Sequence, residues 1–298
     1  MATLHFHAKA SGMDGQTKDL LRILAPNPSP LTGPGTTTFL LGQEETAVID
    51  PGPDDAGHLA AIRQAARGRI SHIIVTHAHL DHSAGARRLS DMTGAPVLAF
   101  GDALSGRSPL MKRLSDHGVG GGEGLDLTFT PDIRLRDADV IRGADWSLTA
   151  LHTPGHSGGH LSLQWGDQVF CGDLVMGWSS TIISPPDGDL ADYLRSLDRL
   201  AQTGARRLLP AHGAPIEDPL ARLSELAAHR RQRSAQILAV LRDGPSNAAT
   251  IAARIYDVAP HLMPAATRNV LAHLLALADL GAIAPLGLLG PETSFASL

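Results

Sequence analysis

The 298-residue sequence contains a single cysteine, Cys171. One cysteine excludes an intramolecular disulfide and a cysteine-based zinc cluster, so neither can stabilise the fold. Because Cys171 lies in an apolar stretch, we expect a small core residue rather than a nucleophile. Aromatic residues make up only 4% of the chain, which leaves Ala, Leu and Gly to fill most of the core.

Long apolar segments are also missing. No stretch of about 18 uncharged apolar residues occurs, as a membrane-spanning helix would require. The nearest run, residues 270–290, is interrupted by His273 and Asp279. The first 15 residues carry His5, His7 and Asp14 and lack an apolar core with a small-residue cleavage site, unlike a secretory or transit signal. We therefore expect a cytoplasmic protein that does not associate with a membrane.

Positive charge is not in excess, since 25 Lys and Arg against 30 Asp and Glu give a net charge of −5. Such a chain produces no global field that would attract nucleic acid or an anionic membrane. Hydrophobic residues form 43% of the sequence, an ordinary share for a globular protein. A chain of this length has room for one large α/β domain and a small additional module.

Short apolar runs alternate with amphipathic segments and predict an α/β domain. Strands are expected at residues 36–41, 46–50, 69–75, 96–100, 127–130, around 141, 146–151, 160–165, 168–172 and 206–210. Helices are expected at residues 55–67, 82–93 and 189–203. Residues 101–124 carry the fewest structural signals and end in GVGGGEG, which suggests a mobile loop over a site.

The pattern changes to helices after about residue 217. Three helices are expected, at residues 218–242, 247–256 and 265–280, followed by a short apolar tail that resembles a hairpin. This order is typical of a winged-helix module. We place the boundary so that residues 1–220 form the catalytic domain and residues 221–298 form the small C-terminal domain.

The segment Thr76-His77-Ala78-His79-Leu80-Asp81-His82 stands apart from the other histidines, most of which are isolated. It follows an apolar strand directly, at the position where open α/β sheets place ligands. Crowding so many titratable groups at one strand end is costly without a partner. A divalent cation removes that cost, because neutral imidazoles and carboxylates are the ligands that zinc accepts.

The spacing within this segment predicts two metals. Residues two apart in an extended segment point the same way, so His77 and His79 can reach one metal together. Asp81 and His82 lie past the bend, at the start of a helix, and can serve a second metal nearby. Two metals about 3.5–4 Å apart polarise a substrate and supply hydroxide at neutral pH.

Three further donors follow predicted strands downstream: His156, Asp173 and His212. Each alone is more simply explained as a polar residue of a turn. Together, at the ends of three apolar strands and downstream of the histidine cluster, they form a coherent set. Asp173 also has the two carboxylate oxygens that bridging two metals requires.

The pattern HxHxDH, followed by a single His, a single Asp and a final His, resembles the metallo-β-lactamase superfamily over about residues 27–213. The resemblance implies a four-layer αβ/βα sandwich with the site at the edge between two sheets. It implies two zinc ions, with iron or manganese as alternatives. It also divides the ligands between the metals: His77, His79 and His156 for the first, Asp81, His82 and His212 for the second, and Asp173 for both.

Further residues resemble the β-lactamase-like protein 2 branch of this superfamily. They comprise the stretches NPSP (27–30), GTTTF (35–39) and IDPG (49–52), together with the C-terminal helical module. The branch includes a single-strand-selective endoribonuclease and thioesterases that act on carrier-bound polyketides. Asp173 stands where many exported zinc β-lactamases carry cysteine, which argues against antibiotic hydrolysis as the main activity.

Five more residues are candidates for supporting roles. Asp50 is expected to anchor the site by hydrogen bonding, although it also suits a cap of the Pro-Gly turn. His160 is expected to support a ligand rather than bind metal itself. Ser179, Ser180 and Thr181 are candidate substrate contacts, with a generic polar loop as the alternative.

The predicted function is a hydrolase in which a metal-bridging hydroxide, oriented by Asp81, attacks a carbonyl or phosphoryl centre. The bond remains open: an ester or thioester of a small-molecule or carrier-bound acyl substrate, or a phosphodiester of single-stranded RNA. The acidity of the chain argues against a polyanionic substrate, which would require a basic groove. Residues that could supply such a groove are Arg87, Arg88, Arg107, Lys112 and Arg113.

A non-enzyme alternative is a nucleic-acid-binding protein that uses the winged helix. From residue 223 onward six arginines face five acidic residues, and this near-balance is poor for phosphate binding. Packing against the catalytic domain or formation of a homodimer is therefore the expected role of the module. Redox chemistry at a di-iron site is a third alternative, disfavoured because no flavodoxin-like domain is attached.

Overall fold

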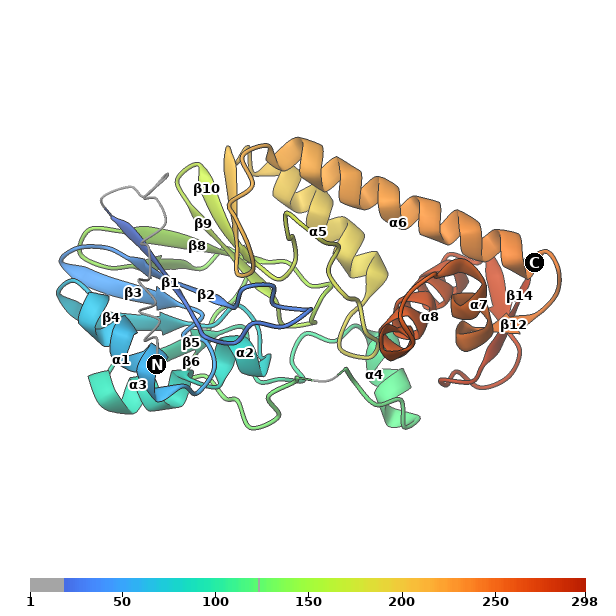
Figure 1. Cartoon of the computed structure of the whole chain (residues 1–298), viewed down its shortest axis with the longest axis horizontal. Coiled ribbons are helices and arrows are strands. Elements are labelled where there is room, and N and C mark those ends of the chain that lie inside the picture. The colour runs from blue at the N-terminus through green and yellow to red at the C-terminus, as the bar shows by residue number, and fades with distance from the viewer. Residues whose placement is uncertain (1–18, 123) are drawn as a thin grey trace, which may run out of the picture.

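The computed structural model describes residues 19–122 and 124–298. The segment considered above for targeting signals falls within residues 1–18, outside the described residues. The described chain contains two β-sheets packed face to face, helices on their outer faces, and a helical module at one end (Figure 1). In this part of the chain, none of the helices combines the length and apolar character needed to span a bilayer.

The first sheet has the strand order β1-β2-β3-β4-β5-β6. Its strands are β1 (Leu20–Leu24), β2 (Thr37–Leu41), β3 (Glu45–Ile49), β4 (Arg69–Ile74), β5 (Val97–Ala99) and β6 (Ile133–Arg134). The first three pair antiparallel, and β3 to β6 pair parallel. β2 and β5 are buried at every position, as expected of strands covered on both faces.

The second sheet has the order β11-β10-β9-β8-β7. Its strands are β7 (Val140–Arg142), β8 (Ser147–His152), β9 (Leu161–Trp165), β10 (Gln168–Gly172) and β11 (Arg207–Pro210). All neighbours pair antiparallel except β10 and β11. Side chains of both sheets meet in one core, where the rings of Phe39 and Phe170 pack edge to face with centroids 5.0 Å apart.

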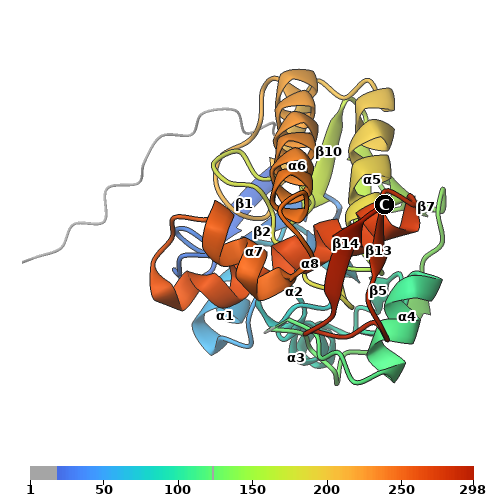
Figure 2. The same ribbon diagram turned by 90° about the vertical axis from the view of Figure 1, so that its right-hand side faces the viewer.

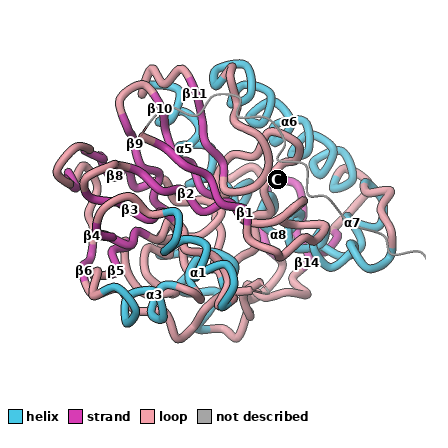
Figure 3. The backbone as a smooth tube through the Cα atoms, turned by 60° about the vertical axis from the view of Figure 1, so that its left-hand side comes forward, coloured by secondary structure: helices cyan, strands magenta, loops and turns pink. Residues whose placement is uncertain are grey.

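Helices cover the outer faces of both sheets (Figure 3). The helices α1 (Ala56–Ala65) and α3 (Ala86–Thr93) pack on the first sheet, and α5 (Leu190–Gln202) and α6 (Pro219–Leu241) pack on the second. The result is the four-layer αβ/βα sandwich that the sequence predicted. The helix expected at 82–93 is interrupted, because α2 (Leu80–Ser83) ends before α3 begins.

The C-terminal module contains α7 (Ala248–Ile255), the 3₁₀ turn η1 (Pro260–Leu262) and α8 (Met263–Asp279). Its small sheet has the order β12-β14-β13, from β12 (Ser246–Asn247), β13 (Ile283–Pro285) and β14 (Ser294–Ser297). The 23-residue helix α6 leads into it (Figure 2). Leu226 near the start of α6 packs on the catalytic layers and Leu241 at its end packs in the module. The predicted boundary at 220/221 thus lies in the first turn of a helix that both parts share.

Two predictions made from the sequence are wrong. Residues 101–124 contain α4 (Pro109–Asp116), whose Met111 and Leu114 pack in the core of the C-terminal module. The strand expected at residues 127–130 is a turn. The carboxylate of Asp126 accepts hydrogen bonds from the backbone N–H and the hydroxyl of Thr128 (3.1 and 2.7 Å), and this local turn overrides the β-propensity of Thr and Phe.

Candidate metal centre

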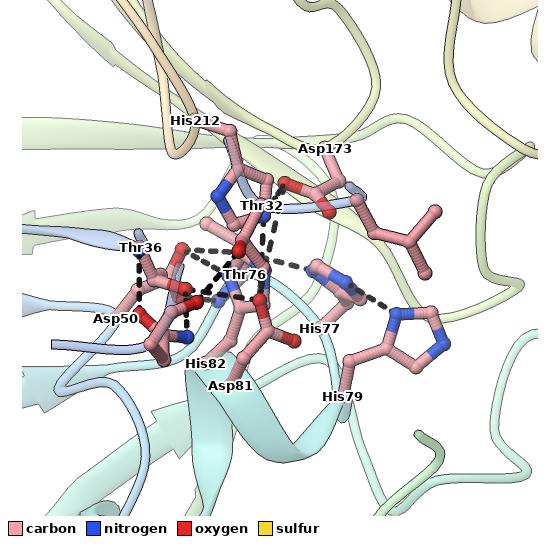
Figure 4. Close-up of polar contacts among 12 residues, drawn as sticks. Thr32, Thr36, Asp50, Thr76, His77, His79, Asp81, His82, Asp173 and His212 are labelled. Carbon is pink, nitrogen blue, oxygen red and sulfur yellow. Dashed lines mark hydrogen bonds and ion pairs between the residues drawn. The ribbon is translucent and has the colours of Figure 1, made fainter. Parts of the chain in front are cut away.

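The site lies where the two sheets come together at the ends of β4 and β11. There the Thr37 N–H donates to the Ala211 carbonyl (2.7 Å), and the Leu161 N–H donates to the Thr76 carbonyl (2.8 Å). Each of these bonds joins a strand or loop of one sheet to one of the other. The polar residues that follow β4, β10 and β11 are therefore brought to one place (Figure 4).

One group of donors consists of His77, His79 and His156. His77 and His79 lie in the extended segment after β4, and His156 lies in the turn after β8. The Nδ1 atom of His79 is 2.9 Å from His77 Nε2 and 3.0 Å from His156 Nε2. Three imidazole nitrogens thus converge on one point.

A second group consists of Asp81, His82 and His212. Asp81 and His82 lie in α2, and His212 follows β11. The Oδ2 atom of Asp81 is 3.3 Å from both His82 Nε2 and His212 Nε2. The bend at the start of α2 separates these donors from His77 and His79.

Asp173 lies between the two groups. Its Oδ1 atom is 3.2 Å from His212 Nε2 and 3.5 Å from His82 Nε2, and its Oδ2 atom is 3.8 Å from His156 Nε2. One carboxylate therefore offers a different oxygen to each group. The structure brings together all seven residues that the sequence predicted as ligands.

The arrangement fits two divalent cations. In three trios of these residues, all ligand atoms lie within 4.8 Å of one another: His77, His79 and His156; His77, His82 and Asp173; and Asp81, His82 and His212. A tetrahedral zinc ion with ligands near 2.1 Å would separate them by about 3.4 Å. His82 Nε2 and Asp173 Oδ1 are buried without a hydrogen-bond partner among the described residues, as expected of atoms meant for a cation.

Electrostatics distinguish the two groups. Burial, followed by the neighbouring His156 and His82, lowers the pKa of His79 to about 3. Burial and His82 likewise hold the pKa of His77 well below its usual value. The imidazoles of these two ligands are therefore neutral, as metal coordination requires.

The second group lies in a negative environment. Burial lowers the pKa of His82 and His212, but neighbouring carboxylates outweigh this effect. Asp81 holds the pKa of His82 well above its usual value, and Asp173 raises the pKa of His212 to about 10. Burial raises the pKa of Asp173, but His212 and His82 hold it well below its usual range. The carboxylates thus attract positive charge at a point where a metal ion would supply it.

Comparison with known proteins agrees with this geometry. The model of the family described as "Metallo-beta-lactamase superfamily" matches residues 31–212, from before the first predicted ligand to the last. The chain belongs to the metallo-β-lactamase superfamily. The model of the beta-lactamase associated winged helix domain matches residues 248–287, which confirms the predicted winged helix. Membership also confirms that the protein is a metal-dependent hydrolase.

Three members of the superfamily are especially informative. A beta-lactamase-like protein 2 homolog of Drosophila melanogaster is 30% identical over 273 residues, which are 87% of each chain. An atrochrysone carboxyl ACP thioesterase of Aspergillus fumigatus is 27% identical, over 83% of this chain and 75% of the relative. The crystal structure of a metallo-beta-lactamase family protein of Thermus thermophilus has a TM-score of 0.75 and 26% identity, covering 94% of this chain and 99% of the other.

As in other metal sites, the outer nitrogens of the ligand imidazoles are held by oxygen atoms. His82 Nδ1 donates to Asp50 (3.0 Å), His156 Nδ1 donates to the Ile182 carbonyl (2.8 Å), and His212 Nδ1 donates to the Gly35 carbonyl (3.3 Å). When the ring is neutral, as in metal binding, each bond keeps the proton on Nδ1 and leaves Nε2 without a proton and directed into the site.

Asp50 supports the candidate metal centre through three contacts. Its carboxylate accepts from the backbone N–H and the hydroxyl of Thr76 (2.7 and 2.8 Å) as well as from His82. The Thr76 hydroxyl, having donated its proton, accepts from His77 Nδ1 (3.1 Å). Asp50 thereby orients one ligand directly and another through Thr76, in addition to sitting at the Pro-Gly turn.

His160 lies outside the trios of potential metal ligands. Its Nε2 accepts from the backbone N–H of Asp173 (3.3 Å), and its Nδ1 lies 3.1 Å from the Thr153 hydroxyl. Thr181 is buried, with its hydroxyl 3.1 Å from His156 Nδ1, so it faces a ligand. The Ser179 and Ser180 side chains are partly exposed and remain candidate substrate contacts.

Sequence reasoning missed two threonines of the site. The Thr36 hydroxyl donates to Asp81 Oδ2 (3.0 Å), and Thr76 connects Asp50 with His77 as described above. Thr36 is 45 positions from Asp81 and reaches it only because β2 and β4 belong to one sheet. Nothing near Thr36 in the sequence indicates this contact, whereas the place of Thr76 at the head of the histidine segment is a usable signal.

Proposed function

We propose that the chain is a dinuclear metal hydrolase, with zinc as the metal, that cleaves an acyl thioester or a related ester. The position of Asp173 carries the proposal, because its two carboxylate oxygens face two different donor groups. His77, His79 and His156 would hold one metal, and Asp81, His82 and His212 would hold the other. Such metals, when bound, supply Lewis acidity and lower the pKa of a coordinated water.

The contribution of the protein to the reaction begins with Asp81. The carboxylate is held by the Thr36 hydroxyl (3.0 Å). Burial raises the pKa of Asp81, but His82 and His212 outweigh this effect and lower it below its usual value. An ionised carboxylate accepts hydrogen bonds, so Asp81 can orient the attacking water by accepting a hydrogen bond from it.

Apolar side chains next to the ligands favour an acyl substrate. Leu80 lies between two ligands in the sequence and is 48% exposed, and Trp178 is 49% exposed. The Trp178 ring lies against Gly33 and against Gly213, the residue after His212. An acyl chain could bury these surfaces, which a polyanion would leave exposed.

The chemistry of the leaving group also favours a thioester. A thiolate, with a conjugate-acid pKa of about 8.5, departs without a general acid at neutral pH. All the histidines and carboxylates that form the potential metal trios are assigned as ligands. Asp50 is already engaged by Thr76 and His82. The relative from Aspergillus fumigatus is itself named a thioesterase.

Three of the five basic residues that could line a groove for single-stranded RNA are paired with carboxylates. Arg87 pairs with Asp132 (2.8 Å), Arg88 with Asp54 (3.0 Å) and Arg107 with Asp187 (2.5 Å). A groove that binds phosphates requires basic side chains available to the nucleic acid. An endoribonuclease is therefore the less favoured alternative.

Arginines of the C-terminal module are also engaged internally. Arg230 is buried, Arg233 lies over the Tyr256 ring (4.0 Å), and Arg254 pairs with Asp243 (3.4 Å). These contacts engage three of the six arginines beyond residue 223 and so reduce the positive charge available for DNA phosphates. A role in binding nucleic acid is correspondingly disfavoured.

A comparison of substrates tests the proposal. Protein loaded with zinc would be assayed on medium-chain acyl thioesters, the matching oxygen esters, a lactone, a β-lactam, a phosphodiester and single-stranded RNA, with metal content measured in parallel. We expect two metal equivalents and the highest kcat/KM on thioesters. Cleavage of RNA without thioesterase activity would instead support the endoribonuclease. Less than one equivalent under metal-replete conditions would refute the dinuclear site.

A further inference from the structure

The segment Thr181-Ile182-Ile183 lies behind the ligand His156. The Ile182 carbonyl accepts a hydrogen bond from His156 Nδ1 (2.8 Å), and the Thr181 hydroxyl lies 3.1 Å from the same atom. Thr181 and Ile183 are almost completely buried. The orientation of the His156 ring therefore depends on where this backbone segment is held.

Two side chains from the C-terminal helices hold the segment. Arg230 of α6 donates from Nη2 to the Thr181 carbonyl. Asn269 of α8 accepts from the Ile183 N–H (3.3 Å) with its side-chain oxygen. The same oxygen accepts from Arg230 Nη1 (3.3 Å), so the two side chains brace one another.

Arg230 is costly as a purely structural residue. It is 2% exposed, and its guanidinium carbon also lies over the ring of Tyr193, 5.2 Å from the ring centroid. None of these partners is a carboxylate, and Nε has no hydrogen-bond partner among the described residues. A buried cation in such surroundings is usually less stabilising than an apolar side chain of similar volume. The role of Arg230 must then lie in holding the groups that accept its hydrogen bonds.

We propose that Arg230 and Asn269 are positioning residues for the metal ligand His156, and that the winged-helix module thereby completes the metal centre of the catalytic domain. The chain of contacts runs from α6 and α8 through the 181–183 backbone to His156 Nδ1. Loss of a direct hydrogen-bond partner of a ligand imidazole typically changes metal affinity by a factor of about 10 to 100, and Arg230 and Asn269 hold the backbone on both sides of such a partner, the Ile182 carbonyl. The inference rests on the proposed function only in taking His156 as a metal ligand.

Arg233 supplies a matched control on the same helix. It is three residues beyond Arg230, and its contacts are with Gln236, the Ile255 carbonyl and the Tyr256 ring. All of these lie within α6 and the C-terminal module. An Arg233→Gln substitution removes a guanidinium from α6 without touching the 181–183 segment.

The test measures metal binding directly. Arg230→Gln, Asn269→Ala and Arg233→Gln would be titrated with zinc against a chromophoric chelator, and the Co²⁺-substituted proteins would be compared by visible absorption. We expect the first two to weaken one of the two metal sites about 10- to 100-fold and to change the Co²⁺ spectrum. Arg233→Gln should keep wild-type affinity and spectrum. Unchanged affinity in Arg230→Gln and Asn269→Ala would overturn the proposal.

A double-mutant cycle separates positioning from general stability. In a His156→Ala background, Arg230→Gln should cause no further loss of metal affinity, because the ligand it positions is gone. Additive losses would show that Arg230 acts elsewhere and would overturn the proposal. Should Arg230→Gln fail to fold, Asn269→Ala in the same His156→Ala background provides the same comparison. Failure of the wild-type protein to hydrolyse any ester would refute the proposed function but leave this measurement intact.

Discussion

Asp173 owes its position to the glycine that precedes it. Gly172 has a φ of +47°, a conformation that strains most other residues. A Cβ atom there would lie 2.6 Å from His160 Nε2 and 2.9 Å from the Thr76 hydroxyl oxygen. The strand β10 can therefore end beside His160 and Thr76 and deliver the Asp173 carboxylate between the two donor groups.

Removal of the shared carboxylate should affect both metals. We expect Asp173→Ala to lose at least one metal equivalent and to lower kcat/KM by a factor of about 10² or more, since the metals supply the nucleophile. Elemental analysis and thioester hydrolysis would measure the two effects. Asp167→Ala, which removes an exposed carboxylate from the β9–β10 turn, is the control and should match the wild type. Full activity of Asp173→Ala would contradict the dinuclear mechanism.

Asp50 allows a subtler substitution. Its φ is +51°, which asparagine tolerates better than most residues, so Asp50→Asn should preserve the backbone. The loss of the negative charge beside His82 should weaken metal binding about 10- to 100-fold, measured by chelator competition. The corresponding change at the α1 cap, Asp55→Asn, should leave affinity unchanged. Equal affinities in Asp50→Asn and wild type would show that Asp50 only shapes the turn.

Local signals made the metal ligands predictable, whereas contacts of the supporting residues depend on the tertiary fold. All seven ligands lie in the segments that follow strands, with Asp81 and His82 in the short helix α2, in patterns visible in the sequence. Arg230 lies in the run HRRQR, which looks like an exposed, charged helix face. Its burial follows from the packing of α6 between the catalytic layers and the module, and no pattern within α6 reveals this.

At the level of secondary structure, the sequence at the start of α4 contains a helix-start signal. Ser108 caps the helix by accepting from the Met111 N–H (3.3 Å), and Pro109 occupies the first turn. A serine followed by proline is a standard helix start. The glycines further along, which include Gly118 and Gly120 to Gly122, obscured it.

The helices α6 and α8 enclose a histidine that should make stability depend on pH. His273 is fully buried beside Ser234 (2.8 Å), and burial, followed by Arg230 and Arg233, lowers its pKa to about 3. The folded state keeps the ring neutral, whereas the unfolded chain protonates it below about pH 6.5. This contribution to stability is present above pH 6.5 and is lost as the pH falls from 6.5 towards 3.

At about pH 5 the loss from His273 should amount to about 2 kcal/mol. Denaturant unfolding at about pH 8 and about pH 5 would measure it. In His273→Leu the difference between the two pH values should shrink by about that amount, whereas the same change at the exposed His261 should preserve it. An unchanged pH dependence in His273→Leu would show that the ring is protonated in the folded protein.

For the whole molecule, the shared helix α6 makes the two predicted domains interdependent. The start of α6 covers the outer face of the second sheet together with α5, and Met111 of α4 packs in the opposite direction, into the core of the C-terminal module. Each predicted domain therefore contributes a helix that packs in the core of the other. A cut at residue 220 would expose apolar surface on both sides.

We expect the fragment 1–220 to aggregate and to bind metal poorly, and the full chain to unfold in a single transition. Gel filtration, metal analysis and calorimetry would measure these properties. A longer fragment, 1–242, keeps α6 but lacks Asn269, and it should remain more soluble than 1–220 while still binding metal more weakly than the full chain. A monomeric 1–220 fragment with wild-type metal content would contradict the expected interdependence.

The buried Cys171 has a practical consequence for labelling the protein in solution. Its side chain is inaccessible, and burial raises the pKa of the thiol, so little of the reactive thiolate forms. Because the chain has no second cysteine, the native protein should resist maleimide reagents while folded. A cysteine introduced at an exposed position of the module, such as Leu288→Cys, would then accept a fluorophore or spin label selectively, with the native thiol left in place.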